Sequence, residues 1–202
     1  MPTFEEIKRV LSNVTIGIAG VGGLGSNVAM TLTRAGIGKL IIADFDVVSE
    51  SNLNRQFYFR SQIGQKKVEA LKANLLNINP DVKVISFDIR LNEDNISEIF
   101  STVDVMVEAV DNAEMKKLIT EVFQEKYPNM PLILGNGMAG WGQSNDMQVT
   151  QYGSLYVCGD GKSEVSETLP PIAPRVGICA CMQANVVLSI VLDPLFKQKH
   201  LP

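Results

Sequence analysis

The sequence predicts an α/β fold: a Rossmann-like, doubly wound and mainly parallel sheet with helices on both faces. Two observations lead to this prediction. Apolar runs of strand length alternate along the chain with segments whose apolar residues recur every three or four positions, as on one face of a helix. A strand that is followed by a helix and another strand pairs in parallel through a right-handed crossover, so the alternation gives a sheet that is covered on both sides.

The expected elements follow one another in this order. Strands are predicted at 15–20, 39–44, 82–89, 103–110 and 131–136. Helices are predicted from the glycine-rich turn after the first strand to about Ala35, at 66–78, at about 95–100 and at 113–127. The segment 66–78 is the clearest of these helices because its apolar residues are spaced by three and four positions, and Pro128 ends the helix at 113–127.

The region 137–174 departs from the alternation. It is rich in glycine and serine and contains short β-like pieces at 146–151 and 154–158, so we expect an irregular, partly antiparallel segment over the far edge or active face of the sheet. The apolar run 176–192 then closes the domain. Polar residues interrupt this run, whereas a membrane span needs about 20 clean apolar residues, so we predict a buried helix. We expect one domain over residues 1–202.

Composition and charge exclude several classes of protein. Of the 202 residues, 46% are hydrophobic and 20% are charged, which excludes intrinsic disorder. A net charge of −4 argues against a broad basic face for nucleic acid. Three cysteines do not make a disulfide framework, and the amino terminus has no apolar signal segment. We therefore expect a cytoplasmic protein with no nucleic-acid or membrane partner.

A glycine-rich motif follows the first strand. Gly20, Gly22 and Gly25, with Gly23 between them, fit the pattern G-x-G-x-x-G at the start of a helix, where free backbone N–H groups can bind phosphate. Asp44, about 20 residues downstream at the end of the second strand, can accept hydrogen bonds from ribose hydroxyls. The alternative is a turn that only packs the helix on the strand. The motif does not separate ATP from NAD.

Two cations after the second strand favour a triphosphate. Arg55 suits bidentate contact with phosphate oxygens, and Lys67, in the first turn of a helix beside Val68, is expected to point inward. For Lys66 we prefer a solvated surface. A dinucleotide, whose two phosphates already meet the glycine loop, would gain little from further cations.

A carboxylate is expected in the same crevice. Asp111 follows the strand at 103–110, and ligands of open α/β sheets bind at the carboxyl ends of the strands. An aspartate there, opposite a triphosphate, is most simply a magnesium ligand. The alternative is that Asp111 or Asn112 caps the helix at 113–127.

These motifs, in this order, resemble a known family. GVGGLGS, LIIADFDVVSESNLNRQF, GQKKVEAL and VEAVDN closely resemble the ubiquitin-activating-enzyme-like superfamily of ThiF and MoeB adenylyltransferases. The resemblance runs from about Val14 to Asn112 and resumes at 173–192. GMAGWGQSN and YVCGDG look most like the compact ThiF variant that is linked to thiamine biosynthesis.

The resemblance implies an activity and a set of residues. The reaction is MgATP-dependent adenylation of the C-terminal glycine carboxylate of a small ubiquitin-fold carrier protein, here ThiS-like, with release of pyrophosphate. The carrier later becomes a thiocarboxylate, so a sulfur donor protein is a further expected partner, and family members are commonly homodimers. The implied nucleotide-binding residues are Gly20, Gly22, Gly23, Gly25, Asp44, Asp46, Asn52, Arg55, Gln56, Lys67, Asp111 and Asn112.

The chemistry fits this inventory. A carboxylate nucleophile is ionised at neutral pH and needs no general base, and the chain has one histidine, His200. Arg55, Lys67 and a magnesium ion on Asp111 would stabilise the leaving pyrophosphate and are the predicted catalytic groups.

Three departures from the family are visible. Three cysteines cannot make a four-cysteine zinc site, so we predict no structural zinc. Cys158 lies in the region where some relatives use a thiol for sulfur transfer, and it is either such a thiol or an ordinary loop cysteine, whereas Cys179 and Cys181 are expected in the core. Relatives contribute an arginine from the neighbouring subunit, for which Arg9 is a candidate substitute.

Three alternative functions stay open. An NAD-dependent dehydrogenase would need a proton donor that the sequence does not offer. An enzyme of the same superfamily could act on a MoaD-like carrier or on tRNA threonylcarbamoyladenosine, although the acidic balance weighs against RNA. A catalytically silent half of a heterodimer would have no reason to keep Arg55, Lys67 and Asp111.

Overall fold

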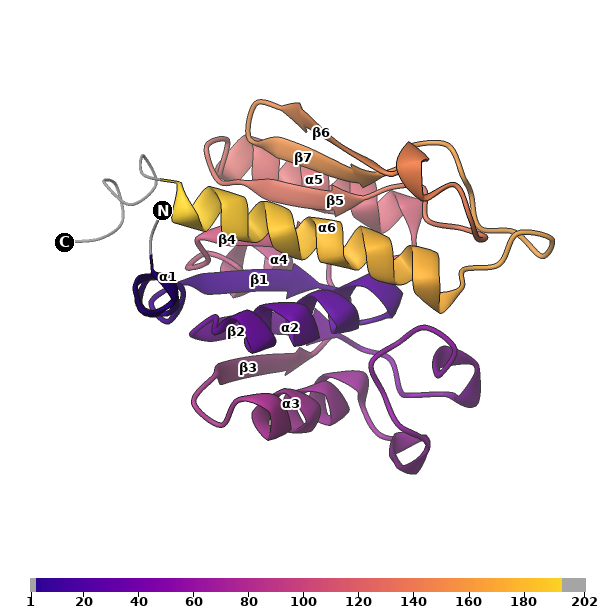
Figure 1. Cartoon of the computed structure of the whole chain (residues 1–202), viewed down its shortest axis with the longest axis horizontal. Helices are drawn as coiled ribbons and strands as arrows, with labels where there is room; N and C mark the ends of the chain where they lie inside the picture. Colours follow the sequence, from indigo (N-terminus) through magenta and orange to yellow (C-terminus); the bar gives the residue numbers. More distant parts are fainter. Residues whose placement is uncertain (1–2, 194–202) are drawn as a thin grey trace.

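The described residues, 3–193 of a computed structural model, form a seven-stranded sheet flanked by helices (Figure 1). The strands are β1 (Thr15–Ala19), β2 (Lys39–Asp44), β3 (Lys83–Asp88), β4 (Val105–Glu108), β5 (Leu132–Gly135), β6 (Gln148–Tyr152) and β7 (Leu155–Gly159). The helices are α1 (Phe4–Leu11), α2 (Gly23–Ala35), α3 (Lys67–Ile78), α4 (Glu93–Ile99), α5 (Ala113–Lys126) and α6 (Ala173–Leu192), with short 3-10 turns at Glu50–Asn52, Arg60–Gln62 and Ser144–Asp146.

The strand order is β3-β2-β1-β4-β5-β7-β6, and every neighbouring pair is parallel except the β6–β7 hairpin. The chain therefore winds from β1 to β3 in one direction, returns, and continues from β4 on the other side of β1. The carboxyl ends of β1 and β4 border the point where the winding reverses, which is where ligands of such sheets bind. The predicted fold class is confirmed.

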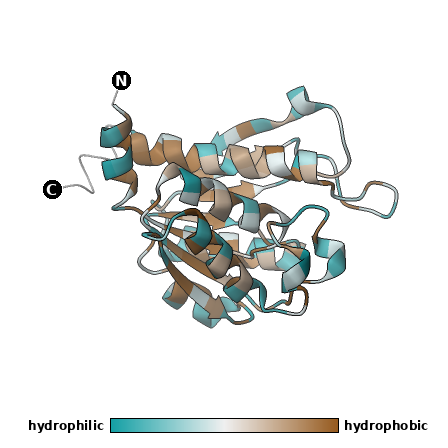
Figure 2. Cartoon of the chain, turned by 60° about the horizontal axis from the view of Figure 1, so that its bottom comes forward, coloured by the Kyte–Doolittle hydropathy of each residue, from teal (hydrophilic) through white to brown (hydrophobic). Residues whose placement is uncertain are grey.

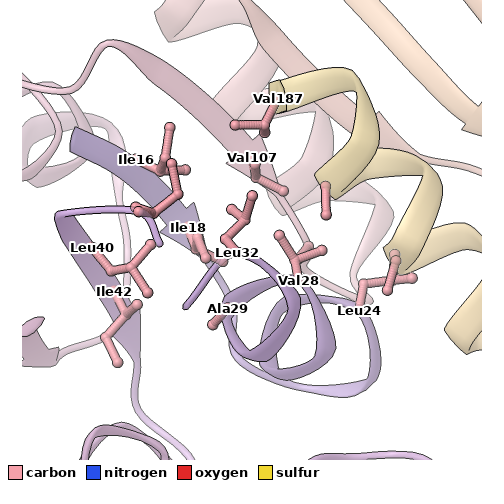
Figure 3. Packing of buried hydrophobic residues seen from close by; sticks show 14 of the residues in the cluster. Ile16, Ile18, Leu24, Val28, Ala29, Leu32, Leu40, Ile42, Val107 and Val187 are labelled. Carbon is pink, nitrogen blue, oxygen red and sulfur yellow. The ribbon is translucent and has the colours of Figure 1, made fainter. Parts of the chain in front are cut away.

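The strands bury both faces, as parallel strands do. Residues of β1 and β2 alternate between two apolar cores: Ile16, Ile18, Leu40 and Ile42 face α2 and α6, and Ala19 and Ile41 face the core formed with α4 and α5. Figure 3 shows the first core, where side chains of α2 and Val187 of α6 meet the sheet.

Helix α6 is the buried helix that the sequence predicts. It is long and apolar enough to cross a membrane by length and composition, but half of its most apolar window is buried inside the protein. Val176, Cys179, Ala184 and Val187 belong to the core shared with α2. Figure 2 shows apolar residues along this helix and along the strands, with polar residues on the outer helices and loops. The helix begins earlier than predicted because Pro174 is well suited to a first turn.

The region 137–174 is more regular than predicted. Its two β-like pieces form the hairpin β6–β7, and β7 pairs in parallel with β5, so the region extends the sheet itself. Helix α1 was not predicted. Thr3 and Glu6 begin it with a reciprocal capping box, in which each side chain accepts the backbone N–H of the other residue.

Candidate functional site

The glycine loop connects β1 to α2, and glycine is needed at its three motif positions for different reasons. Gly20 has a φ of 82°, which favours glycine, and a Cβ atom at Gly25 would lie 1.9 Å from the Gly20 carbonyl oxygen. A Cβ atom at Gly22, in contrast, would meet nothing closer than 3.6 Å. Gly20 and Gly25 therefore shape the turn and its packing, and Gly22 leaves the backbone open to a ligand.

The amino terminus of α2 is available to an anion. No side chain caps the helix at Gly22, and the Ser26 N–H makes the first bond, to the Gly22 carbonyl at 3.1 Å. The N–H groups in the turn before Ser26 therefore have no intrahelical acceptor, and they carry the positive end of the helix dipole. This is the geometry that phosphate groups bind at helix starts.

Asp44 fixes this loop from the end of β2. Its carboxylate accepts the Val21 N–H at 2.8 Å and the Asp46 N–H at 2.9 Å. The side chain is half-buried, and each carboxylate oxygen keeps acceptor capacity for a ligand hydroxyl. Asp44 thus lies where the sequence predicts a ribose contact, and it also holds the loop in shape.

Lys67 points inward, as predicted, and its partner is Asp46. The Lys67 side chain is buried at the start of α3 and its Nζ lies 2.7 Å from Asp46 Oδ2, while the Lys67 backbone N–H donates to the Asp46 carbonyl at 2.9 Å. Asp46 is exposed, so the buried Lys67 side chain ends at a carboxylate that solvent and ligands can reach. Lys66 lies on the exposed surface, where it pairs with Asp88.

Arg55 and Gln56 lie beside the glycine loop. The Arg55 side-chain carbons come within 3.7 Å of the position of a Cβ at Gly23. The Arg55 guanidinium donates to the Ser51 carbonyl at 3.2 Å and to Asn54 Oδ1 at 2.8 Å. Gln56 is 9% exposed, and its buried Oε1 has no hydrogen-bond partner. The Gln56 oxygen therefore keeps its acceptor capacity for a ligand or a water molecule beside the glycine turn.

Asn52 has a structural role in the same segment. Its Oδ1 accepts the Ser49 N–H at 3.0 Å and closes the 3-10 turn that carries the chain toward Arg55. The predicted phosphate contact of Asn52 stays a prediction.

Two residues of the site were missed by sequence analysis. The Tyr58 hydroxyl donates to the Val21 carbonyl at 2.7 Å, and burial, with the charges of Asp44 and Asp46, raises the pKa of this phenol. The Asn27 amide donates to the Gly23 carbonyl at 2.7 Å and to the Arg55 carbonyl at 2.8 Å. Neither residue belongs to a spaced motif, so only their position near the glycine and NRQF motifs could have indicated them.

The sequence left open whether Asp111 is a magnesium ligand or whether Asp111 or Asn112 caps the following helix. Asn112 is the cap of α5, since its Oδ1 accepts the Met115 N–H at 2.9 Å. Asp111 is exposed and is not needed as the cap. The stretch from β4 to Asp111 lies against the glycine loop, because the Ala109 carbonyl is 2.9 Å from the position of a Cβ at Gly20.

A buried polar network lies behind Asp111. Glu108, at the end of β4, is fully buried and forms a salt bridge with Lys116 of α5, which also donates to the Gly135 carbonyl at 2.9 Å. Burial raises the pKa of the Glu108 carboxyl above its usual value, although Lys116 acts against this. Gln183 of α6 donates to the Glu108 carbonyl at 3.1 Å. Sequence analysis did not assign this network.

A second buried salt bridge ties the region 137–174 to α6. Arg175 Nη2 lies 2.5 Å from Asp160 Oδ2, and Arg175 Nη1 donates to the Gly142 carbonyl at 2.8 Å. Burial works to raise the pKa of Asp160, but hydrogen bonds from two backbone amides and the charge of Arg175 outweigh it and hold the pKa below its usual value. The neighbouring Val176 packs against Gly23, so this bridge also places α6 beside the glycine loop.

The structure corrects two expectations for the cysteines. Cys158 is on strand β7, fully buried, and burial raises the pKa of its thiol to about 12, so it is not an accessible loop thiolate. Cys181 is exposed rather than in the core, whereas Cys179 is buried as predicted. Within residues 3–193, no group of three or more His, Cys, Asp or Glu side chains could hold a metal ion. Arg9 is exposed on α1, which precedes β1 and so lies at the sheet end away from the glycine loop (Figure 1).

Comparisons with known proteins agree with this geometry. The family model described as the ThiF family matches residues 2–201. The adenylyltransferase and sulfurtransferase UBA4 of Meyerozyma guilliermondii is 35% identical over 192 residues, covering 89% of this chain and 44% of that protein. The SAMP-activating enzyme E1 of Haloferax volcanii is 30% identical over 192 residues, covering 92% of this chain and 69% of that protein.

Solved structures share the fold. The E. coli tRNA N6-threonylcarbamoyladenosine dehydratase TcdA, in complex with ATP, superimposes with a TM-score of 0.86 at 20% identity, covering 98% of this chain and 92% of that one. E. coli MccB with AMPCPP and MccA gives a TM-score of 0.72 at 24% identity, covering 94% of this chain and 60% of that one. The chain spans less than half of the UBA4 proteins that it matches.

Proposed function

The chain belongs to the ThiF family, and on this premise we propose that it catalyses MgATP-dependent adenylation of the C-terminal glycine carboxylate of a small, ThiS-like ubiquitin-fold carrier protein. Its curated relatives include adenylyltransferases, the SAMP-activating enzyme and ubiquitin-like modifier-activating enzyme 5. The last of these names describes activation of a ubiquitin-like modifier and supports a partner of that kind.

One observation carries the proposal. At the point where the sheet reverses its winding, a helix amino terminus without a side-chain cap, the side chain of Arg55, the buried ammonium of Lys67 and the exposed carboxylate of Asp111 all border the glycine loop or the strand end beside it. A diphosphate group meets the helix terminus alone, and the additional cations suit a triphosphate whose leaving group gains charge. This favours ATP over a nicotinamide dinucleotide.

The residues of the site align the two reactants and stabilise the charge of the leaving group, and none of them has to transfer a proton. The attacking glycine carboxylate is ionised at neutral pH, so the site needs only to hold it in line with the α-phosphorus. The N–H groups at the start of α2 bind the phosphate oxygens, and Arg55 and Lys67 stabilise the pyrophosphate as it leaves. Magnesium, which prefers oxygen ligands, would be held by Asp111 and would neutralise charge on the phosphates.

We further propose that the carrier serves thiazole formation in thiamine biosynthesis and that a sulfur donor protein acts on the adenylated carrier in the next reaction. We also propose that the enzyme is a cytoplasmic homodimer. The net charge of −4 supports a protein substrate over a tRNA, although the fold is that of TcdA.

Carrier-dependent exchange of pyrophosphate into ATP tests the function. The purified protein is incubated with MgATP, labelled pyrophosphate and ThiS-type or MoaD-type carriers. The matched control is each carrier without its terminal Gly-Gly. Exchange that requires the intact tail supports the proposal. Tight ATP binding with no exchange on any carrier would contradict it, and exchange with the MoaD type alone would reassign the carrier.

A further inference from the structure

The turn that carries Asp111 is held by a buried side chain from the strand before it. Only three residues separate Glu108 at the end of β4 from the cap of α5 at Asn112. The Val110 N–H donates to Glu108 Oε1 at 2.8 Å, so the Glu108 side chain folds back on its own following backbone. The Ala109 N–H donates to the Ala19 carbonyl of β1 at 2.9 Å. The direction in which Asp111 leaves the sheet depends on these bonds.

Lys116 connects this turn to the next strand. Its ammonium binds the second Glu108 oxygen and the Gly135 carbonyl at the end of β5. Because Lys116 lies on α5, one turn after its cap at Asn112, the same group also fixes the start of the helix relative to both strands. The Gln183 amide from α6 donates to the Glu108 carbonyl and secures the turn from the opposite face of the sheet.

A buried salt bridge of this kind is weak evidence for stability. Removing two charges from water is costly, and well-packed apolar residues of similar size often stabilise a fold equally well or better. What an apolar pair cannot do is accept the Val110 N–H and bind the Gly135 carbonyl. The specific contribution of the Glu108–Lys116 pair is therefore the orientation of the turn between β4 and α5.

We propose that Glu108 and Lys116 are positioning residues for magnesium at Asp111: they hold the Asp111 carboxylate where it can bind the metal of MgATP. The inference rests on the proposed function. It assigns neither residue a contact with the nucleotide or the metal. Residues that orient a metal ligand through a direct hydrogen bond typically change metal affinity by about 10- to 100-fold when they are removed. Glu108 and Lys116 act through the backbone of the turn, so we expect an effect at the lower end of this range.

The test compares ATP binding with and without magnesium. The double variant Glu108→Leu/Lys116→Met removes the bridge without leaving an unpaired buried charge, and Lys117→Met, at an exposed position of the same helix, is the matched control. Calorimetry measures ATP affinity in EDTA and in a magnesium titration, without any carrier. We expect ATP affinity in EDTA within about twofold of wild type, and a magnesium requirement that rises about tenfold or more.

Two outcomes overturn the positioning role. An unchanged magnesium dependence in the folded double variant contradicts it, as does an equal loss of ATP affinity with and without the metal. If the double variant does not fold, Glu108→Gln, which keeps the shape and an acceptor for Val110, is measured in the same way and by the same criteria. A wild-type protein that binds no ATP would instead refute the proposed function.

Discussion

Gly22→Ala separates the ligand role of the glycine loop from its structural role. Gly22 has a φ of −79°, so an L residue meets no left-handed strain there, and an added Cβ would meet nothing nearer than Gln56 Nε2 at 3.6 Å. The methyl group would stand in this open space beside the loop, where we expect a phosphate to approach the N–H groups of α2. We therefore expect a folded protein that binds ATP poorly.

The magnitudes follow from these contacts. An alanine in open space changes the free energy of unfolding by no more than about 1 kcal/mol, which for a chain of this size shifts Tm by about 2–4 °C. The loss of close backbone approach to a charged phosphate costs about 1.5–3 kcal/mol, the value of hydrogen bonds to charged groups. That is about a 10- to 100-fold loss of ATP affinity.

Thermal unfolding and calorimetric titration with ATP measure the two effects. Gly25→Ala is the matched control, because its Cβ would lie 1.9 Å from the Gly20 carbonyl oxygen and must destabilise the loop itself. A Gly22→Ala protein that keeps wild-type ATP affinity would refute the assignment of this loop as the phosphate site. If Gly22→Ala lowers Tm as much as Gly25→Ala does, the space beside Gly22 is not open to a methyl group and this part of the argument is wrong.

Three further results are expected. Asp111→Ala abolishes magnesium-dependent exchange of pyrophosphate into ATP and leaves Tm unchanged, because Asn112 and not Asp111 caps α5. An active variant would show that Asp111 is not a magnesium ligand. The pKa of Asp160 lies below its usual value, so its contribution to stability is full above about pH 4 and decreases as pH falls through the folded pKa. Urea unfolding from pH 3 to 7 should show a larger decrease in stability toward acid pH in wild type than in Asp160→Asn, and equal decreases would contradict this role. Cys158→Ala keeps pyrophosphate exchange within about twofold of wild type, and iodoacetamide labels Cys181 and not the buried Cys158 in the native wild-type protein. Labelling of Cys158, or loss of activity in the variant, would indicate that this thiol takes part in the reaction.

The sequence predicted the parts of the site that depend on local pattern. The alternation of strands and helices placed β1, β2 and the glycine loop, and Lys67 could be oriented because it adjoins the apolar stripe of α3 at Val68. The carboxyl-end rule for parallel strands predicted that Asp111 follows β4 near the glycine loop, and the Ala109 carbonyl does lie against Gly20.

The remaining features depend on how helices and loops pack on the sheet. Nothing in the sequence indicates that Asp46 pairs with Lys67, 21 residues later, or Glu108 with Lys116, eight residues later, because each pair depends on the turn between a strand and the following helix. The error at Cys158 has the same origin. Its segment looks like an isolated β-like piece in a glycine-rich region. The pairing of β7 with β5 and β6 places Cys158 in the sheet, and packing in the core shared with α6 buries the thiol.

The central claim is that this protein joins AMP to the carboxylate of a ubiquitin-fold carrier. Intact-mass spectrometry of a Gly-Gly-ended carrier, incubated with the protein, MgATP and pyrophosphatase, tests it directly. The account predicts a carrier that gains one AMP on its terminal glycine, and no such product with Lys67→Met. An unmodified carrier in a reaction where the protein binds or consumes ATP would contradict it.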